Sequence, residues 1–241
     1  MERIFIDLRQ KLRAICQDQG LLNETITIRA KPLTPEEAIG NPEAKDFPLH
    51  QGKERLMQAQ LGSGTGQAFT DQYGDYTGTL AGLMDMDLAN NFRRAIFVAS
   101  LNAVLDHLGL VQGTTHCRDQ GPTLCAPEVA AHVAQRYAPR RVLQVGFQPC
   151  LVERFGQNYD FRVLDLDPDN IGQKKRGVLV EGPEAAAEAM DWADLLLVTG
   201  TTLANGTIGD FLNSKPVVFY GTTIAGAAHL MGWDRVCPQS S

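Results

Sequence analysis

Two short apolar runs in the C-terminal part of the chain each lead into a loop of glycine and threonine. Threonine hydroxyls and the backbone N–H groups around glycine form hydrogen-bonding surfaces for oxygen-rich or negatively charged small molecules. None of these groups is a ligand preferred by soft metals. The runs are Leu195–Val198 and Val217–Tyr220, and the loops are Thr199-Gly200-Thr201-Thr202 and Gly221-Thr222-Thr223.

The elements that carry these loops are predicted to be parallel β-strands. Both apolar runs are short, lack polar alternation and precede helix-forming residues, which is typical of strands covered on both faces. In an open α/β sheet the ligand lies beyond the carboxyl ends of the strands. The two loops are therefore expected to meet at one ligand-binding edge, where Thr201 and Thr202 could cap the next helix.

The C-terminal half alternates strand and helix patterns, which predicts right-handed crossovers and a doubly wound sheet. After about Cys125 this sheet should be mainly parallel, with Gly146, Asp167, Thr199 and Gly221 at one edge. The further predicted strands are 141–146 and 161–167, and the predicted helices are 127–137, 183–190, 203–212 and 224–231.

The N-terminal half has a different pattern. A helix over 4–15 should end at Gly20, and a strand over 25–29 should stop at Lys31-Pro32. An exposed connection is expected over 32–48 and a helix over 88–110. Residues 54–70 are predicted to be extended, and the glycines of 62–66 indicate a hairpin or bulge, because no Gly-Lys-Ser/Thr follows to make a phosphate loop. The composition shift between Gly113 and Cys125 predicts domains at 1–113 and 114–241.

A dinucleotide fingerprint is absent after the first strand of the predicted sheet. The pattern G-x-G-x-x-G would need glycines where Gln148 and Leu151 stand. Asp165 or Asp167, after the second strand, could hold a ribose hydroxyl, but capping the turn at 168–170 is the favoured interpretation. No NAD site is therefore predicted, and the cofactor stays unknown.

Two asparagines are candidates for ligand contacts. Asn102 lies on the small-residue face of the 88–110 helix, where its buried amide needs partners, either backbone groups or a ligand. Asn205 is expected in the first turn of the 203–212 helix together with Gly206 and Thr207. These residues are poor helix formers, which favours a binding role for Asn205.

Metal binding is a further hypothesis. His116 and Cys117 stand together in the linker, with Cys125 and Cys150 beyond them, and imidazole and thiolate suit zinc and later transition metals. The spacing matches no zinc-finger pattern, so His116 and Cys117 remain candidates only. An odd number of cysteines at irregular spacings argues against a disulfide framework.

Composition narrows the range of partners. The chain has 241 residues, with 22 Lys and Arg against 28 Asp and Glu, and a formal charge of −6 disfavours nucleic acid. Neither a signal-peptide pattern at Met1–Asp7 nor an apolar run of membrane-spanning length is evident. We expect a cytoplasmic protein without a membrane partner, and a homodimer is an open hypothesis.

The segment Asp194–Thr207, the Gly221-Thr222-Thr223 loop and Gly232-Trp233-Asp234 resemble the putative heavy-metal chelation family. The helix around Asn102 and the His116-Cys117 linker are also similar to that family's pattern, although Pro-Ser commonly follows the glycine where Thr222-Thr223 stands here. The resemblance implies an α/β fold. A small α+β domain like the enolase N-terminal domain would precede a Rossmann-like domain with a mainly parallel sheet, and a pocket would lie between them.

Three hypotheses on function follow, and whether the chain is an enzyme stays open. The preferred one is an interdomain pocket that binds, and by condensation or hydrolysis transforms, a small anionic or heterocyclic metabolite of metallophore, flavin or pterin type. The alternatives are direct metal chelation through histidine and cysteine, and a methyltransferase-like protein that uses S-adenosylmethionine. The expected ligand-binding residues are Asn102, Gly146, Asp167, Thr199, Gly200, Thr201, Thr202, Asn205, Gly221, Thr222 and Thr223.

Overall fold

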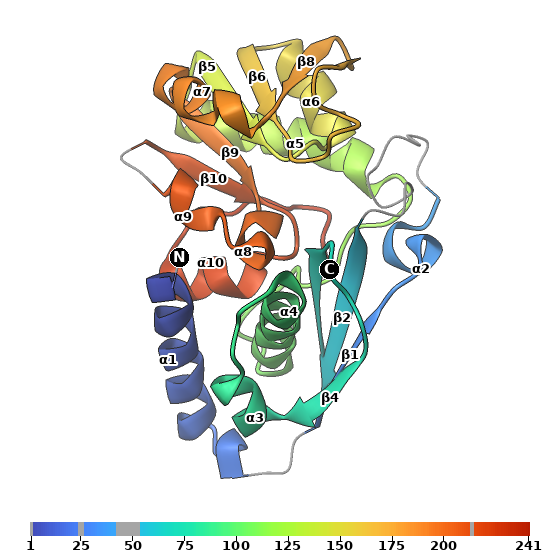
Figure 1. The fold of residues 1–241 in the computed structure, drawn as a ribbon, viewed down its shortest axis with the longest axis vertical. Coiled ribbons are helices and arrows are strands. Elements are labelled where there is room, and N and C mark those ends of the chain that lie inside the picture. The colour runs from blue at the N-terminus through green and yellow to red at the C-terminus, as the bar shows by residue number, and fades with distance from the viewer. Residues whose placement is uncertain (1, 24–26, 42–53, 213–214) are drawn as a thin grey trace.

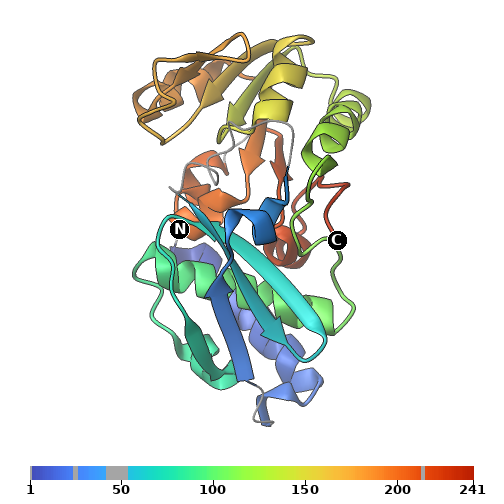
Figure 2. The same ribbon diagram turned by 90° about the vertical axis from the view of Figure 1, so that its right-hand side faces the viewer.

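The computed structural model describes residues 2–23, 27–41, 54–212 and 215–241 (Figure 1 and Figure 2). Within these ranges, no helix is both long enough and apolar enough to cross a membrane. The elements of the N-terminal half are α1 (Glu2–Asp18), η1 (Leu21–Asn23), β1 (Thr27–Pro32), α2 (Pro35–Ile39), β2 (Arg55–Leu61), β3 (Gly64–Thr70), β4 (Tyr76–Thr79), α3 (Leu80–Asp85) and α4 (Asn91–His107).

The N-terminal half contains an antiparallel sheet with the order β3-β2-β1-β4. The glycine-rich stretch forms the predicted hairpin, because Gly62 and Ser63 connect β2 to β3 and Gly62 takes a positive φ of 58°. Gly64 and Gly66 have a different role. A Cβ on Gly66 would lie 2.2 Å from the Ala99 carbonyl oxygen, so the missing side chain lets β3 pack directly against α4.

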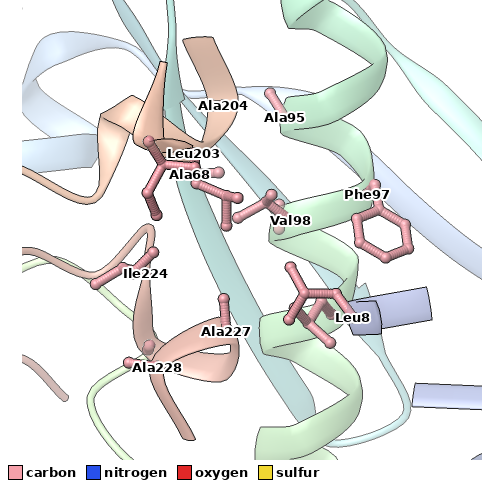
Figure 3. Packing of buried hydrophobic residues seen from close by; sticks show 14 of the residues in the cluster. Leu8, Ala68, Ala95, Phe97, Val98, Leu203, Ala204, Ile224, Ala227 and Ala228 are labelled. Carbon is pink, nitrogen blue, oxygen red and sulfur yellow. The ribbon is translucent and has the colours of Figure 1, made fainter. Parts of the chain in front are cut away.

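Helix α4 lies at the centre of the molecule, between the small sheet and the C-terminal half (Figure 1). Every residue from Arg94 to Leu105 is buried, as expected for a helix covered on all sides. Figure 3 shows its neighbours, which come from α1, β3, α8 and α10. The residues labelled there are Leu8, Ala68, Ala95, Phe97, Val98, Leu203, Ala204, Ile224, Ala227 and Ala228. One hydrophobic cluster thus joins both halves of the chain.

The C-terminal half is a sheet with helices on both faces, and its strand order is β10-β9-β5-β6-β8-β7. All neighbouring strands are parallel except β7 and β8. Its elements are α5 (Gly121–Arg136), β5 (Arg141–Val145), α6 (Pro149–Gly156), β6 (Asp160–Leu164), β7 (Lys174–Lys175), β8 (Val178–Glu181), η3 (Pro183–Ala185), α7 (Ala186–Trp192), β9 (Leu195–Thr199), α8 (Thr201–Asn205), α9 (Ile208–Phe211), β10 (Val217–Tyr220) and α10 (Ala225–Met231).

The parallel arrangement confirms the predicted edge. The carboxyl ends of β5, β6, β9 and β10 lie on the same side, so Gly146, Asp167, Thr199 and Gly221 share it. After β5, the chain adds β6 and β8 on one side of that strand. It then crosses back and adds β9 and β10 on the other side. The order therefore reverses between β5 and β9, which is where open α/β sheets hold ligands.

Several predicted boundaries were wrong. Helix α5 begins six residues before Pro127, because Pro122 starts it and Pro127 is accommodated inside. The predicted 203–212 helix is two short helices, since Gly206 takes a left-handed conformation and ends α8. Part of the predicted 32–48 connection forms α2, which a capping box between Thr34 and Glu37 stabilises, whereas 42–48 lies outside the described residues.

Short elements were not predicted at all. They are η1, α3, α6, β4, β7 and β8, which have between two and eight residues each. A pattern of that length carries little periodicity, so packing decides such elements.

Candidate functional site

A cavity of about 640 Å³ lies at the carboxyl ends of the parallel strands. Its opposite wall comes from the N-terminal half, where Glu54 precedes β2 and Phe69 and Asp71 lie at the end of β3. Much of the lining is apolar, and the described lining residues include neither lysine nor arginine. The sequence-predicted residues that line it are Gly146, Asp167, Thr199, Gly200, Thr201, Thr202, Asn205, Gly221 and Thr223, together with His116 and Cys117.

The first threonine loop is folded on itself. The Thr202 hydroxyl donates to the Thr199 carbonyl at 2.7 Å, and the Thr199 hydroxyl donates to the Thr201 hydroxyl at 3.2 Å. Gly200 occupies the N-cap of α8 without a side-chain cap, so the predicted capping by Thr201 or Thr202 was wrong. The hydroxyls instead set the shape of the loop.

Glycine lets the strand ends approach one another. A Cβ on Gly200 would lie 2.7 Å from the backbone nitrogen of Ile224, so Gly200 brings the two threonine loops into contact. Gly146 has a φ of 89°, and the Tyr220 hydroxyl donates to its carbonyl at 2.8 Å. Burial raises the pKa of Tyr220, which keeps this donor protonated. The floor of the cavity is therefore a rigid hydrogen-bonded surface.

Asn102 and Thr222 do not line the cavity, which corrects their expected placement. Asn102 is fully buried, and its Nδ2 donates to the carbonyls of Gln67 (2.9 Å), Thr222 (3.1 Å) and Thr223 (3.3 Å). Its Oδ1 accepts from the Gly226 N–H at 2.8 Å. These partners satisfy the amide within the protein, so Asn102 joins the two halves behind the second loop.

Thr223 links the same loop to the small sheet. Its hydroxyl accepts from the Phe69 N–H at 3.0 Å, while both residues line the cavity. Together with Asn102, this contact holds the wall formed by β3 against the Gly221–Thr223 loop.

Asn205 lines the cavity at the end of α8, and not in a first helical turn as predicted. Its side-chain Oδ1 is shielded from solvent and has no hydrogen-bond partner among the described residues. The buried Arg94 guanidinium donates to the Ala204 carbonyl at 2.9 Å and to the Asn205 carbonyl at 3.5 Å, which fixes the backbone there. Asn205 is thus the predicted residue with the clearest spare hydrogen-bonding capacity.

Carboxyl groups gather on one side of the cavity. Glu54, Asp71, Asp165 and Asp167 all line it, and the negative charges of the three aspartates act on Glu54. Asp165 accepts from the backbone N–H groups of Phe147 (2.6 Å) and Asp167 (2.7 Å), and Asp167 accepts from Asp169 (3.0 Å). Asp167 therefore caps the turn at 168–170, as favoured, whereas Asp165 accepts its bonds from Phe147 and Asp167, outside that turn.

The sequence does not single out Glu54 and Asp71 as site residues. They are remote in sequence from the strand ends that they face, and an isolated carboxylate in an extended segment carries no local signal. Burial, and then repulsion by Asp165, Asp71 and Asp167, raises the pKa of Glu54 from 4.5 to about 7.

This raised pKa predicts a pH-dependent stability. Between pH 4.5 and 7 the unfolded chain loses the Glu54 proton before the folded chain does, so the free energy of unfolding should fall as pH rises through that window. Glu54→Gln removes the ionisation. The free energy of unfolding of the variant should exceed that of the parent by about 1–3 kcal/mol at pH 8 and by less than about 1 kcal/mol at pH 5. Urea denaturation at both pH values measures this.

Glu184→Gln is the matched control, because Glu184 is exposed. The difference in the free energy of unfolding between this variant and the parent should be the same at both pH values. Equal stabilities of the parent and Glu54→Gln at pH 8 would show that Glu54 ionises freely in the folded protein.

His116 and Cys117 lie side by side in the cavity wall, but the structure does not complete a metal site around them. The His116 Nδ1 donates to the Cys117 carbonyl at 2.5 Å, and burial lowers the pKa of His116, which favours the neutral ring. Burial raises the pKa of the Cys117 thiol to about 12, so it is protonated. Across the described ranges, no three His, Cys, Asp or Glu side chains are grouped to hold a metal ion.

The fold and the cavity define an α/β protein in which a small antiparallel sheet and a mostly parallel sheet with helices enclose a small-molecule-sized cavity. Residues 129–228 match the sequence model of a family described as "Putative heavy-metal chelation". This match confirms the resemblance that the threonine loops predicted for this part of the chain.

Two solved structures of proteins of unknown function from the same family are similar to this chain. The one from Pyrococcus horikoshii, a crystal structure at 2.70 Å, has 13% sequence identity and a TM-score of 0.55, and the match covers 91% of this chain and 79% of that chain. The one from Desulfitobacterium hafniense DCB-2, at 2.01 Å, has 15% identity and a TM-score of 0.47 over 73% of this chain and 72% of that chain. The similarity to the Pyrococcus horikoshii protein shows a shared fold and nothing more. No curated protein gives a significant match.

Proposed function

We propose that the cavity binds a small heterocyclic metabolite and that the protein transforms it by condensation or hydrolysis, in chemistry linked to metal chelation. The observation that carries this proposal is the cavity itself. Two threonine loops, a spare amide oxygen on Asn205 and several carboxyl groups surround a largely apolar space. Ligand sites with that composition use the apolar walls for affinity and the few polar groups for orientation.

The proposal includes the two-domain architecture implied by the family resemblance. Residues 1–113 would form a domain like the enolase N-terminal domain, and residues 114–241 a Rossmann-like domain. The strand order with its reversal between β5 and β9 supports the second assignment, because this is the doubly wound order of mononucleotide-binding sheets. The antiparallel sheet with α4 packed on it is compatible with the first.

The charge of the cavity favours a heterocyclic ligand over an anionic one. Glu54, Asp71, Asp165 and Asp167 line it, and no lysine or arginine stands among the described lining residues to balance them. An anion would be repelled at close range in a site of low dielectric constant. Ring N–H or amino groups would instead donate to these carboxylates, and the Phe69 and Phe147 side chains offer surfaces for an aromatic body.

Glu54 is the proposed acid–base group. A carboxyl with a pKa of about 7 exists in both protonation states near neutral pH, so it can accept and return a proton within one reaction cycle. Condensation and hydrolysis both need such a group.

Direct metal chelation is the second candidate, and the description of the family favours it. The neutral His116 ring is the form that binds metals, but the Cys117 thiol would have to lose its proton, and no group of three ligands is found among the described residues, which weighs against it. The third hypothesis, an S-adenosylmethionine-dependent methyltransferase, is less favoured because Asp165, one of its two candidate ribose ligands, already accepts two backbone N–H bonds.

Native mass spectrometry of protein purified without chelator separates these candidates. A retained organic molecule is the expected result, and its mass would identify the ligand class. A stoichiometric metal ion without an organic component would instead support direct chelation. If nothing is retained, thermal-shift screening of pterins, flavins and related heterocycles should yield a stabilising compound, and failure of all heterocycles would refute the proposal.

Asn205→Ala should weaken the binding of a ligand found in this way by about 1–3 kcal/mol, the range for losing one buried polar contact. The thermal stability should change little, because the Asn205 Oδ1 has no partner in the described protein. Calorimetry on the parent and the variant measures the affinity. Asn158→Ala is the matched control, since Asn158 follows α6 and precedes β6 at the opposite end of the sheet. An unchanged affinity with a large loss of melting temperature would show that Asn205 serves the fold.

A further inference from the structure

One end of the cavity is formed by segments that a single buried arginine holds together. Arg94 lies on α4, and its Nε donates to the Ala204 carbonyl at 2.9 Å. Its Nη1 donates to the Leu88 carbonyl at 2.9 Å, and its Nη2 donates to the side-chain Oδ1 of Asn91. The guanidinium therefore fixes the end of α8 against the start of α4.

Asn91 is oriented by this contact. Because its Oδ1 accepts from Arg94, its Nδ2 is the group that can donate on the other side, and it donates to the Asp71 Oδ1 at 2.7 Å. Asp71 follows β3, and both Asp71 and Asn91 line the cavity. Among the described residues, Asn91 is the one donor to this carboxylate. One carboxylate oxygen is thus held by the protein, and the second remains as an acceptor.

Asn205 supplies another acceptor at the same end of the cavity. It is the last residue of α8, which packs against both β3 and α4. Arg94 also donates to its backbone carbonyl at 3.5 Å. Its side-chain Oδ1 is shielded from solvent, and no described residue donates to it. A buried acceptor without a donor destabilises the protein, and an N–H group of a ligand would remove that penalty.

We propose that Asp71 and Asn205 together bind a paired N–H donor on the ligand, as found in an amidine, a guanidine or an amino group beside a ring N–H. This inference rests on the proposed function for the heterocyclic body of the ligand, and it adds the chemical group that this end of the cavity recognises. A carboxylate accepts hydrogen bonds and donates none, so a ligand carbonyl or carboxylate would be disfavoured beside Asp71.

The surrounding contacts favour such a planar donor group. Arg94 bonds to the Asn91 side chain and to the backbone of Asn205, so both acceptors are held in place before a ligand binds. This preorganisation lowers the entropic cost of binding. The negative charge of Asp71 would attract any cation, because the described cavity lining has no lysine or arginine. The two acceptors add a requirement for N–H groups, which distinguishes recognition from attraction by charge.

The test uses the full-length protein and three probes of similar size. Benzamidine carries a positive charge and paired N–H donors. Benzamide has a carbonyl oxygen in place of one nitrogen, and phenyltrimethylammonium has the charge without any N–H group. Calorimetry should show that benzamidine binds about 10- to 100-fold more tightly than either of the other probes, the range for losing a hydrogen bond to a charged group. Equal binding of phenyltrimethylammonium, or no binding of benzamidine, would overturn the proposal.

Asp71→Asn tests the assigned carboxylate. The variant keeps the size of the side chain and an oxygen that can accept from Asn91, but it loses the charge. It should bind benzamidine about 10- to 100-fold more weakly than the parent and leave the affinity for benzamide unchanged. Asp75→Asn is the matched control, since Asp75 is exposed and lies outside the cavity lining, and it should behave like the parent. Loss of benzamidine binding in Glu54→Gln but not in Asp71→Asn would contradict the assignment.

A second pair of probes separates this proposal from the proposed function. Isocytosine and uracil are matched heterocycles, in which the 2-amino group of the first is replaced by oxygen in the second. Isocytosine should bind about 10-fold more tightly, because its amino group and ring N–H form the donor pair. Equal binding of both would show a site for heterocycles without donor recognition. Benzamidine binding that depends on Asp71, with no heterocycle bound, would instead support the donor site and refute the proposed function.

Discussion

Replacing Asn102 by alanine should lower the free energy of unfolding by about 3–5 kcal/mol, because the change breaks a buried network without providing new partners. The Asn102 amide bonds to Gln67 on β3, to Thr222 and Thr223 in the second loop, and to Gly226 on α10. The substitution leaves these backbone groups buried and unsatisfied. Equilibrium urea denaturation of the parent and the variant measures the loss.

Ser100→Ala is the matched control for this prediction. Ser100 lies on the same helix and is also fully buried, but its hydroxyl has no hydrogen-bond partner among the described residues. Its removal should change the free energy of unfolding by less than about 1 kcal/mol in either direction. If Asn102→Ala lowers the free energy of unfolding no more than Ser100→Ala does, the hydrogen bonds of Asn102 do not hold the two halves together.

Gly66→Ala should destabilise the protein by about 3 kcal/mol, although it adds a single methyl group. The new Cβ would lie 2.2 Å from both the Ala103 nitrogen and the Ala99 carbonyl oxygen. Both are backbone atoms of α4, which is buried on all sides and cannot move away cheaply. Thermal and urea denaturation should both report the loss.

Gly82→Ala provides the comparison for Gly66→Ala. Gly82 lies in α3, and a Cβ there would come only within 3.3 Å of the Thr79 hydroxyl oxygen. Alanine is also the better helix former, so this variant should match or exceed the parent in stability. A stability of Gly66→Ala equal to that of Gly82→Ala would mean that β3 and α4 can separate without penalty.

The parallel strands and the sheet edge that carries the cavity were predictable from the amino-acid sequence, because the signals are local. Apolar runs such as Leu195–Val198, followed by glycine and threonine, specify a buried strand and the loop beyond it. The hairpin at Gly62 and the long helix α4 follow from the same kind of pattern. For this reason, nine of the eleven expected ligand-binding residues could be placed beside one cavity.

The roles of individual side chains depend on contacts between distant segments, which local patterns do not encode. The polar amide of Asn102 is suited to contact a ligand. In the folded protein, however, Gln67, Thr222 and Gly226 come from three segments and satisfy its hydrogen bonds. Glu54 has no distinguishing sequence context, and only the packing of the small sheet against the strand ends raises its pKa. Burial and neighbouring charge decide the chemistry of such groups, and both arise only when the chain has folded.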